Sequence, residues 1–127
     1  MAKENYDKAV AQFAVVLFHS ATTTHLMHLQ AKGKGSYAKH KALQEYYEGI
    51  VDLVDGYVEA YQGCYDLIET YPQNYHGAVE AGSYLKKLKD YVTAAEKTLP
   101  DEPNLVNTYA DILDLLDTTI YKLKFLE

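Results

Sequence analysis

The sequence predicts an all-α protein folded as a bundle of four helices. Turn and breaker residues divide the 127-residue chain into four long segments. Within those segments apolar residues recur at helical spacing, and no stretch alternates convincingly between apolar and polar residues. Four helices joined by short connections can bury their apolar stripes against one another, which makes a four-helix bundle the simplest solution.

The first two helices are predicted on either side of a glycine-rich turn. The first covers about residues 5–31 and ends at the Lys-Gly-Lys-Gly sequence of residues 32–35. Ser36 can cap the second helix, because a serine side chain accepts hydrogen bonds from free amide groups in the first turn. The second helix then covers about residues 37–70 and stops at the Tyr-Pro-Gln-Asn sequence of residues 71–74.

The last two helices are separated by two prolines. The third helix is predicted over about residues 77–98, and residues 99–103 (Leu-Pro-Asp-Glu-Pro) break the chain after it. Asp101 or Asn104 can cap the fourth helix, which continues to the C-terminus. We therefore expect a single helical domain over residues 1–127.

Composition excludes several classes of function. The chain has 18 acidic residues and 12 lysines, no arginine, and a formal net charge of −6, so we do not expect it to bind DNA. Cys64 is the only cysteine, which is typical of a reducing compartment. The longest apolar run, residues 13–18, is too short to span a membrane, and the charged N-terminus does not resemble a signal peptide. We expect a cytoplasmic protein.

The second helix carries two stripes. Its apolar stripe predicts the core face and consists of Leu43, Tyr47, Ile50, Val54, Tyr57, Tyr61, Tyr65 and Ile68. Acidic residues form a second stripe, made of Glu48, Asp52, Asp55, Glu59 and Asp66. A solvated surface explains an acidic stripe when it is taken alone.

Two further features indicate a partner subunit. Gly49, Gly56 and Gly63 recur every seven residues beside the acids, and each costs about 1 kcal/mol relative to alanine inside a helix. Close approach of another helix is one reason to keep them, and coincidence is the other. Residues 9–18 are apolar around nearly the whole helix, so a second protein surface is expected to cover the face that the bundle does not.

His28, His40, Asp55 and Glu59 are the candidate metal ligands. The turn between the first two helices brings His28 and His40 together, while Asp55 and Glu59 are neighbours on one helical surface. His40 and Asp55 are fifteen residues apart, about 22 Å along a helix. The histidines of one chain must therefore meet the carboxylates of another, with two copies of the second helix antiparallel about a two-fold axis near Glu48.

Residues 27–63, MHLQAKGKGSYAKHKALQEYYEGIVDLVDGYVEAYQG, resemble the ferroxidase segment of the Dps family of miniferritins. In that family a histidine, a second histidine, an aspartate and a glutamate follow one another at spacings of twelve, about fifteen and four residues. His28, His40, Asp55 and Glu59 have the same residue types, order and spacings. The final segment, TYADILDLLDTTIYKLKFLE, is weakly similar to the last helix of the family.

The resemblance implies a ferritin-like four-helix bundle that binds iron and oxidises iron(II), for detoxification or storage. Zinc or manganese suits the same ligands. Asp52 is expected either to bind a second iron ion or to hold a histidine in place. The implied assembly is a homo-oligomer with a two-fold interface along helices 1 and 2, and the family's usual form is a twelve-subunit shell. The alternative function is a non-catalytic interaction or regulatory protein, with a structural metal site or none.

The resemblance leaves the connection between the second and third helices open. A crossover as long as the bundle needs about a dozen extended residues at 3.3 Å each. Only residues 71–76 are clearly non-helical in the sequence. Either the second helix ends early, near Gly63, or the third helix runs antiparallel to it.

Overall fold

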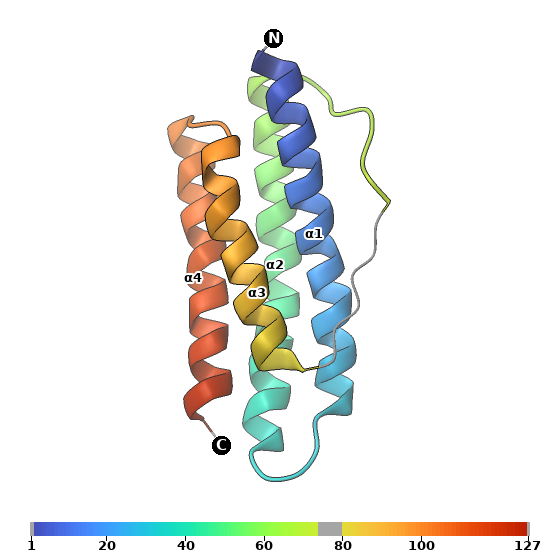
Figure 1. Cartoon of the computed structure of the whole chain (residues 1–127), viewed down its shortest axis with the longest axis vertical. Helices are drawn as coiled ribbons and strands as arrows, with labels where there is room; N and C mark the ends of the chain where they lie inside the picture. The colour runs from blue at the N-terminus through green and yellow to red at the C-terminus, as the bar shows by residue number, and fades with distance from the viewer. Residues whose placement is uncertain (1, 74–79, 127) are drawn as a thin grey trace.

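Figure 1 shows the computed structural model, which describes residues 2–73 and 80–126. The four predicted helices are present as α1 (Ala2–Gln30), α2 (Ser36–Cys64), α3 (Ala81–Ala95) and α4 (Pro103–Phe125). A short 3-10 turn, η1 (Glu96–Thr98), follows α3 directly. The described ranges contain no β-strand. This confirms an all-helical four-helix bundle.

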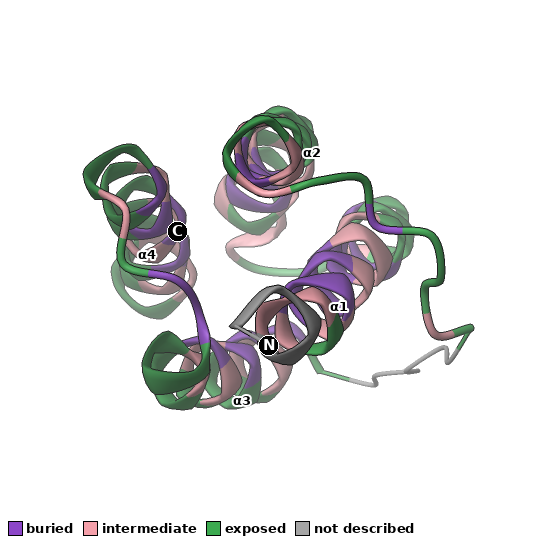
Figure 2. Cartoon of the chain, turned by 90° about the horizontal axis from the view of Figure 1, so that it is seen from above, coloured by how far each residue is buried: buried purple, intermediate pink, exposed green. Residues whose placement is uncertain are grey.

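The helices are arranged as a square in cross-section. The neighbouring pairs are α1–α2, α2–α4, α4–α3 and α3–α1, so α1 lies diagonally opposite α4 (Figure 2). Helix α1 is antiparallel to α2, and α3 is antiparallel to α4 (Figure 1). Helix α3 runs parallel to α2, because the chain after Cys64 returns along the bundle before α3 begins (Figure 1).

This connection decides between the two topologies that the sequence left open. Helix α2 ends at Cys64, so the first alternative is correct and the predicted continuation to Thr70 is wrong. Tyr65 donates the last helical hydrogen bond, to the carbonyl of Tyr61 at 2.9 Å. Ile68 is buried outside the helix, and its amide donates to the side chain of Gln62 at 2.8 Å. Ile68 therefore anchors the crossover rather than extending the core stripe of α2.

The helix starts also differ from the predicted caps. Ser36 is the first residue of α2, and the cap position belongs to Gly35, whose φ of 76° favours glycine. Glu102 precedes α4 with no side-chain cap, and Pro103 begins the helix, where the missing N–H costs nothing. At α3, Glu80 is the cap and accepts from the amides of Gly82 and Ser83. The predicted start at residue 77 lies outside the described residues.

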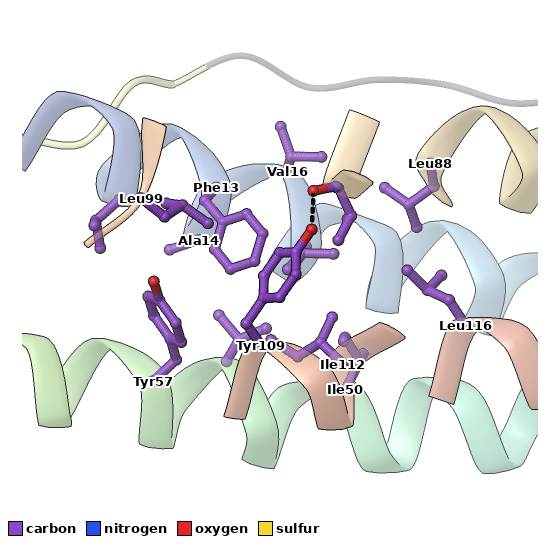
Figure 3. Packing of buried hydrophobic residues seen from close by; sticks show 14 of the residues in the cluster. Phe13, Ala14, Val16, Ile50, Tyr57, Leu88, Leu99, Tyr109, Ile112 and Leu116 are labelled. Atoms are coloured by element: carbon purple, nitrogen blue, oxygen red, sulfur yellow. Dashed lines mark hydrogen bonds between the residues drawn. The ribbon is translucent and has the colours of Figure 1, made fainter. Parts of the chain in front are cut away.

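The core is continuous along all four helices (Figure 3). Phe13 of α1 contacts Tyr57 of α2 at a ring separation of 5.3 Å, and it stacks on Tyr109 of α4 at 6.1 Å. The Tyr109 hydroxyl donates to the carbonyl of Val92 in α3 at 2.7 Å, so its one polar atom is satisfied inside the core. Tyr46 is fully buried as well, and its hydroxyl bonds to Ser20 at 2.7 Å. In the described part of the chain, no helix is long and apolar enough to cross a membrane.

Candidate metal site at the α1–α2 turn

The turn between α1 and α2 brings two candidate ligands together. Gly33 and Gly35 have φ values of 88° and 76°, a left-handed conformation that other residues adopt at a cost. Two such positions within three residues reverse the chain tightly. His28 in the last turn of α1 therefore faces His40 near the start of α2, with ring centroids 3.5 Å apart and planes 24° from parallel.

Each of these rings is held by the backbone of the other residue. Nδ1 of His28 lies 2.7 Å from the carbonyl oxygen of His40, and Nδ1 of His40 lies 2.9 Å from that of His28. A carbonyl oxygen only accepts, so both Nδ1 atoms must carry the proton. In a neutral imidazole, Nε2 then keeps its lone pair, which is the form that binds a metal ion. The fold thus fixes both tautomers.

His25 and Tyr47 complete a ring cluster around this pair. The His25 ring stacks on Tyr47 at 4.1 Å with an interplanar angle of 14°. Tyr47 also meets the edge of His28 at 5.3 Å, whereas the His25 and His28 centroids are 5.9 Å apart. Tyr47 was predicted as a core residue; it is half-buried, packs against the core and also contacts the rings of His25 and His28. Sequence reasoning missed these ring contacts, although Tyr47 follows His40 by two helical turns.

The three candidate carboxylates lie elsewhere. Asp52, Asp55 and Glu59 are all exposed on α2, toward the end opposite to the histidine pair. Because α2 is one continuous helix, the fifteen residues from His40 to Asp55 correspond to about 22 Å. Within the described ranges, no three His, Cys, Asp or Glu residues converge on a point that could hold a metal ion. One chain therefore supplies either half of the predicted site but not both halves together.

Of the three glycines of α2, only Gly49 is closely approached by another described helix of the same chain. A Cβ atom at Gly49 would lie 3.2 Å from the side chain of Leu115, so the helix that approaches closely there is α4 of the same chain. Gly56 and Gly63 would meet no described atom within 4 Å. Near the predicted two-fold axis, Glu48 and Val51 are exposed on the surface of α2.

Exposed apolar side chains lie close to the histidine pair in the sequence. Leu26 and Leu29, on either side of His28, are 51% and 67% exposed, and Tyr37 near His40 is 74% exposed. By contrast, the all-apolar stretch of α1 is largely covered within one chain, since Phe13 and Leu17 are fully buried. Part of the apolar surface that remains uncovered therefore lies near the candidate ligands, and another part lies at the end of α4, where Tyr121 and Phe125 are exposed.

Along α2, exposed lysines lie beside His40 and a group of exposed acids lies farther toward the other end. Lys39 and Lys41 flank His40 and are exposed, whereas the exposed acids Asp52, Asp55 and Glu59 occupy the second half of the helix. Near the middle, Glu48 accepts a hydrogen bond from the side-chain amide of Gln44 at 3.1 Å. Two antiparallel copies of this helix would place unlike charges side by side at both ends.

A second polar cluster, which the sequence did not indicate, lies at the opposite end of the bundle. The Tyr61 hydroxyl donates to the carboxylate of Asp7, joining α2 to α1. The Tyr65 hydroxyl donates to Glu102 at 2.5 Å and joins the end of α2 to the residue before α4. We name Asp7, Tyr61, Tyr65 and Glu102 the tyrosine cluster. No local pattern predicts these pairs, because their members are 54 and 37 residues apart.

Comparison with known proteins gives one match. The model of a family described as "Family of unknown function (DUF5856)" matches residues 28–123, a region that contains His28, His40, Asp55 and Glu59. No curated protein and no solved structure matches significantly.

Proposed function

Because the chain belongs to this family of unknown function (DUF5856), we propose its function from the site itself: a Dps-type, ferritin-like protein that binds and oxidises iron(II) at a site shared by two subunits. The observation that carries the proposal is the reciprocal bonding of His28 and His40. Their Nδ1 protons are committed to backbone carbonyls, which orients the rings and reserves Nε2 for a metal ion.

The donor set fits iron. Imidazole nitrogen with carboxylate oxygen suits iron(II), and also zinc or manganese. The carboxylates of Asp55 and Glu59 favour the more highly charged iron(III), so they promote transfer of an electron from bound iron(II) to peroxide or oxygen. In this proposal iron is the substrate. Asp52, one turn before Asp55, either adds a ligand or holds a histidine of the partner.

A two-fold dimer brings the halves of the site together. With α2 antiparallel to its copy, His40 of one chain approaches Asp55 and Glu59 of the other, which gives two identical sites per dimer. The unlike charges along α2 favour this orientation. Burial of Leu26, Leu29 and Tyr37 would add apolar contact and exclude water from the metal ion.

The topology of the bundle supports the ferritin-like assignment. Ferritin-like folds have one long crossover between two pairs of antiparallel helices. Here the chain between Cys64 and Ala81 connects the antiparallel pair α1–α2 to the antiparallel pair α3–α4, and α3 runs parallel to α2 (Figure 1). In this family of folds, metal sites are built from side chains of the helices themselves.

Iron oxidation tests this proposal. Wild-type protein should oxidise iron(II) saturably with peroxide or oxygen, followed by absorbance, and His40→Ala should abolish the activity while the oligomer remains intact. Asp111→Ala, on the exposed surface of α4 and outside the ring cluster, is the control and should keep the activity. Oxidation no faster than in buffer would reject catalysis. The mass of the assembly decides between storage in a shell and detoxification by a dimer.

The alternative is a non-catalytic interaction protein, which the exposed apolar residues Leu26, Leu29 and Tyr37 also suit. Glu59→Ala separates the two functions, with Asp114→Ala on exposed α4 surface as the control. An enzyme should lose turnover but keep its dimer when Glu59 is replaced. A structural metal site should instead lose dimer stability, measured as the concentration at which the dimer dissociates.

A further inference from the structure

The unequal lengths of α3 and α4 leave a pocket at one end of the bundle. Helix α3 has 15 residues and α4 has 23, a difference of about 12 Å at 1.5 Å per residue. A short connection joins the end of α3 to the start of α4, so the mismatch falls at the other end, where α3 begins (Figure 1). A pocket of about 520 Å³ lies there between the two helices.

The pocket has an apolar floor and a rim of lysines. Ile120 and Leu123 of α4 line it together with Ala81 of α3. Lys86 and Lys89 of α3 border the same space. Lys39 from α2 and Lys124 from α4 also contribute to the lining, so lysines from three different helices meet at one cavity.

The charge of this pocket is opposite to that of the whole chain. Four lysines and two carboxylates, those of Glu80 and Asp90, line it, whereas the chain carries 12 lysines and 18 acids. The Glu80 carboxylate accepts from the amides of Ser83 and Gly82, which lower its pKa and hold it in the cap. These amides are therefore already hydrogen-bonded. An anion in the pocket would be attracted by the lysine side chains rather than by the amides.

We propose that this pocket binds a small organic anion with an apolar part, whose negative group is held by Lys86 and Lys124 while the rest covers Ile120 and Leu123. A fully hydrated ion such as phosphate would leave the apolar floor exposed. Lys89 is already paired with Asp117 at 2.6 Å, so the negative group is assigned to Lys86 and Lys124, to which a nonpolar molecule would offer no counter-charge. This inference goes beyond the iron site and is independent of it.

Binding of anilinonaphthalene sulfonate, an apolar sulfonate whose fluorescence rises on binding, tests the proposal. Lys86→Glu with Lys124→Glu should weaken binding about tenfold, or ~1.4 kcal/mol. Lys8→Glu with Lys97→Glu makes the same charge change elsewhere and should have little effect. Lys8 also borders a larger groove of about 850 Å³ between α1 and α3, so this control detects binding there. Equal loss in both doubles, or no saturable binding to wild type, overturns the proposal.

Two further measurements define the ligand class and protect the test against misfolding. Pyrophosphate should compete poorly with the probe, and Leu123→Ala should weaken the probe. If pyrophosphate competes well and Leu123→Ala changes nothing, the apolar part of the proposal is wrong. Circular dichroism checks the fold of each variant. If the double charge reversal Lys86→Glu with Lys124→Glu unfolds the protein, Lys86→Gln with Lys124→Gln is measured in its place. Iron oxidation should be unchanged in either double, which separates failure here from failure of the iron site.

Discussion

The two ends of helix α2 are both fixed by polar contacts with neighbouring segments. They differ in which side-chain atoms take part in those contacts. In the tyrosine cluster, the hydroxyls of Tyr61 and Tyr65 donate to Asp7 and Glu102, so both phenolic protons are committed within the chain, while the second carboxylate oxygen of Glu102 is buried without a hydrogen-bond partner among the described residues. At the opposite end, His28 and His40 use only Nδ1 in their mutual bonds. Each ring keeps a second nitrogen with a lone pair.

This difference separates a structural cluster from a candidate site. The two tyrosine hydroxyls join separate segments of the chain, so their hydrogen bonds contribute mainly to the stability of the fold. The histidine pair combines fixed tautomers with remaining acceptor capacity, and exposed Leu29 and Tyr37 lie beside it. We therefore expect substitutions in the tyrosine cluster to affect stability most, and substitutions at the ligands to affect metal binding most.

The largest stability change is expected for Tyr61→Ala. Tyr61 is fully buried and bonded to Asp7, so its truncation should cost about 3–5 kcal/mol through the cavity and the lost contacts. Urea unfolding of wild type and variant measures this. Tyr37→Ala is the matched control: its side chain is 74% exposed, and the expected change is within about 0.5 kcal/mol. Equal losses of unfolding free energy in Tyr61→Ala and Tyr37→Ala would contradict the structural role assigned to the tyrosine cluster.

A smaller loss is expected for His28→Ala. His28 is 6% exposed, and its removal leaves the His40 carbonyl without one hydrogen bond and the His40 ring without its stacking partner. The free energy of unfolding should fall by about 1–3 kcal/mol. A loss as large as that of Tyr61→Ala would mean that the histidine pair is primarily a structural element.

Alkaline pH should distinguish the ends without any truncation. Burial and the bond to Asp7 raise the pKa of Tyr61, and the bond to Glu102 with burial raises that of Tyr65, above the ordinary 10.0. Above pH 10.0 the unfolded chain releases phenolic protons that the folded protein retains, so the free energy of unfolding falls as pH rises. Tyr61→Phe should make this fall shallower. His40→Ala should leave its slope unchanged, and the reverse pattern would contradict the comparison.

The smallest stability change is expected at the carboxylates. Asp55 and Glu59 are exposed on α2, so Asp55→Asn with Glu59→Gln should shift the free energy of unfolding by only about 0.5 kcal/mol. Metal binding, measured by calorimetry with cobalt(II), should nevertheless be lost. Asp111→Asn with Asp114→Asn on α4 is the matched control and should retain it. Retention by both doubles would exclude Asp55 and Glu59 as ligands.

The sequence predicts the parts of this fold that depend on local signals. Four helices follow from periodicity and breakers, and the proximity of His28 and His40 follows from the glycines between them. The end of α2 was predicted too late, because Ile68 continues the apolar spacing of the helix although it anchors the crossover. The choice of Gly35 over Ser36 as the cap depends on a left-handed backbone, which spacing does not show.

Features that depend on tertiary contacts could not be predicted from the sequence. The neighbour of Gly49 is Leu115, and no pattern in α2 indicates which helix fills that space. The pairing of Tyr61 with Asp7 likewise requires the fold. For the candidate site, sequence spacing correctly predicted that His28 and His40 lie together and that one helix separates them from Asp55 and Glu59. The reciprocal Nδ1 bonds of the two histidines became visible only in the structure.

The central claim, that two chains share each site, is tested most directly by mixing two inactive variants. His40→Ala and Glu59→Gln should each lose iron oxidation as pure proteins. After dissociation and reassembly in equal amounts, half of the dimers are mixed, and each has one site with all ligands intact, so about a quarter of the wild-type activity should return. Glu59→Gln reassembled with itself is the control. Activity no higher in the mixture than in the pure variants, despite verified subunit exchange, would contradict a shared site.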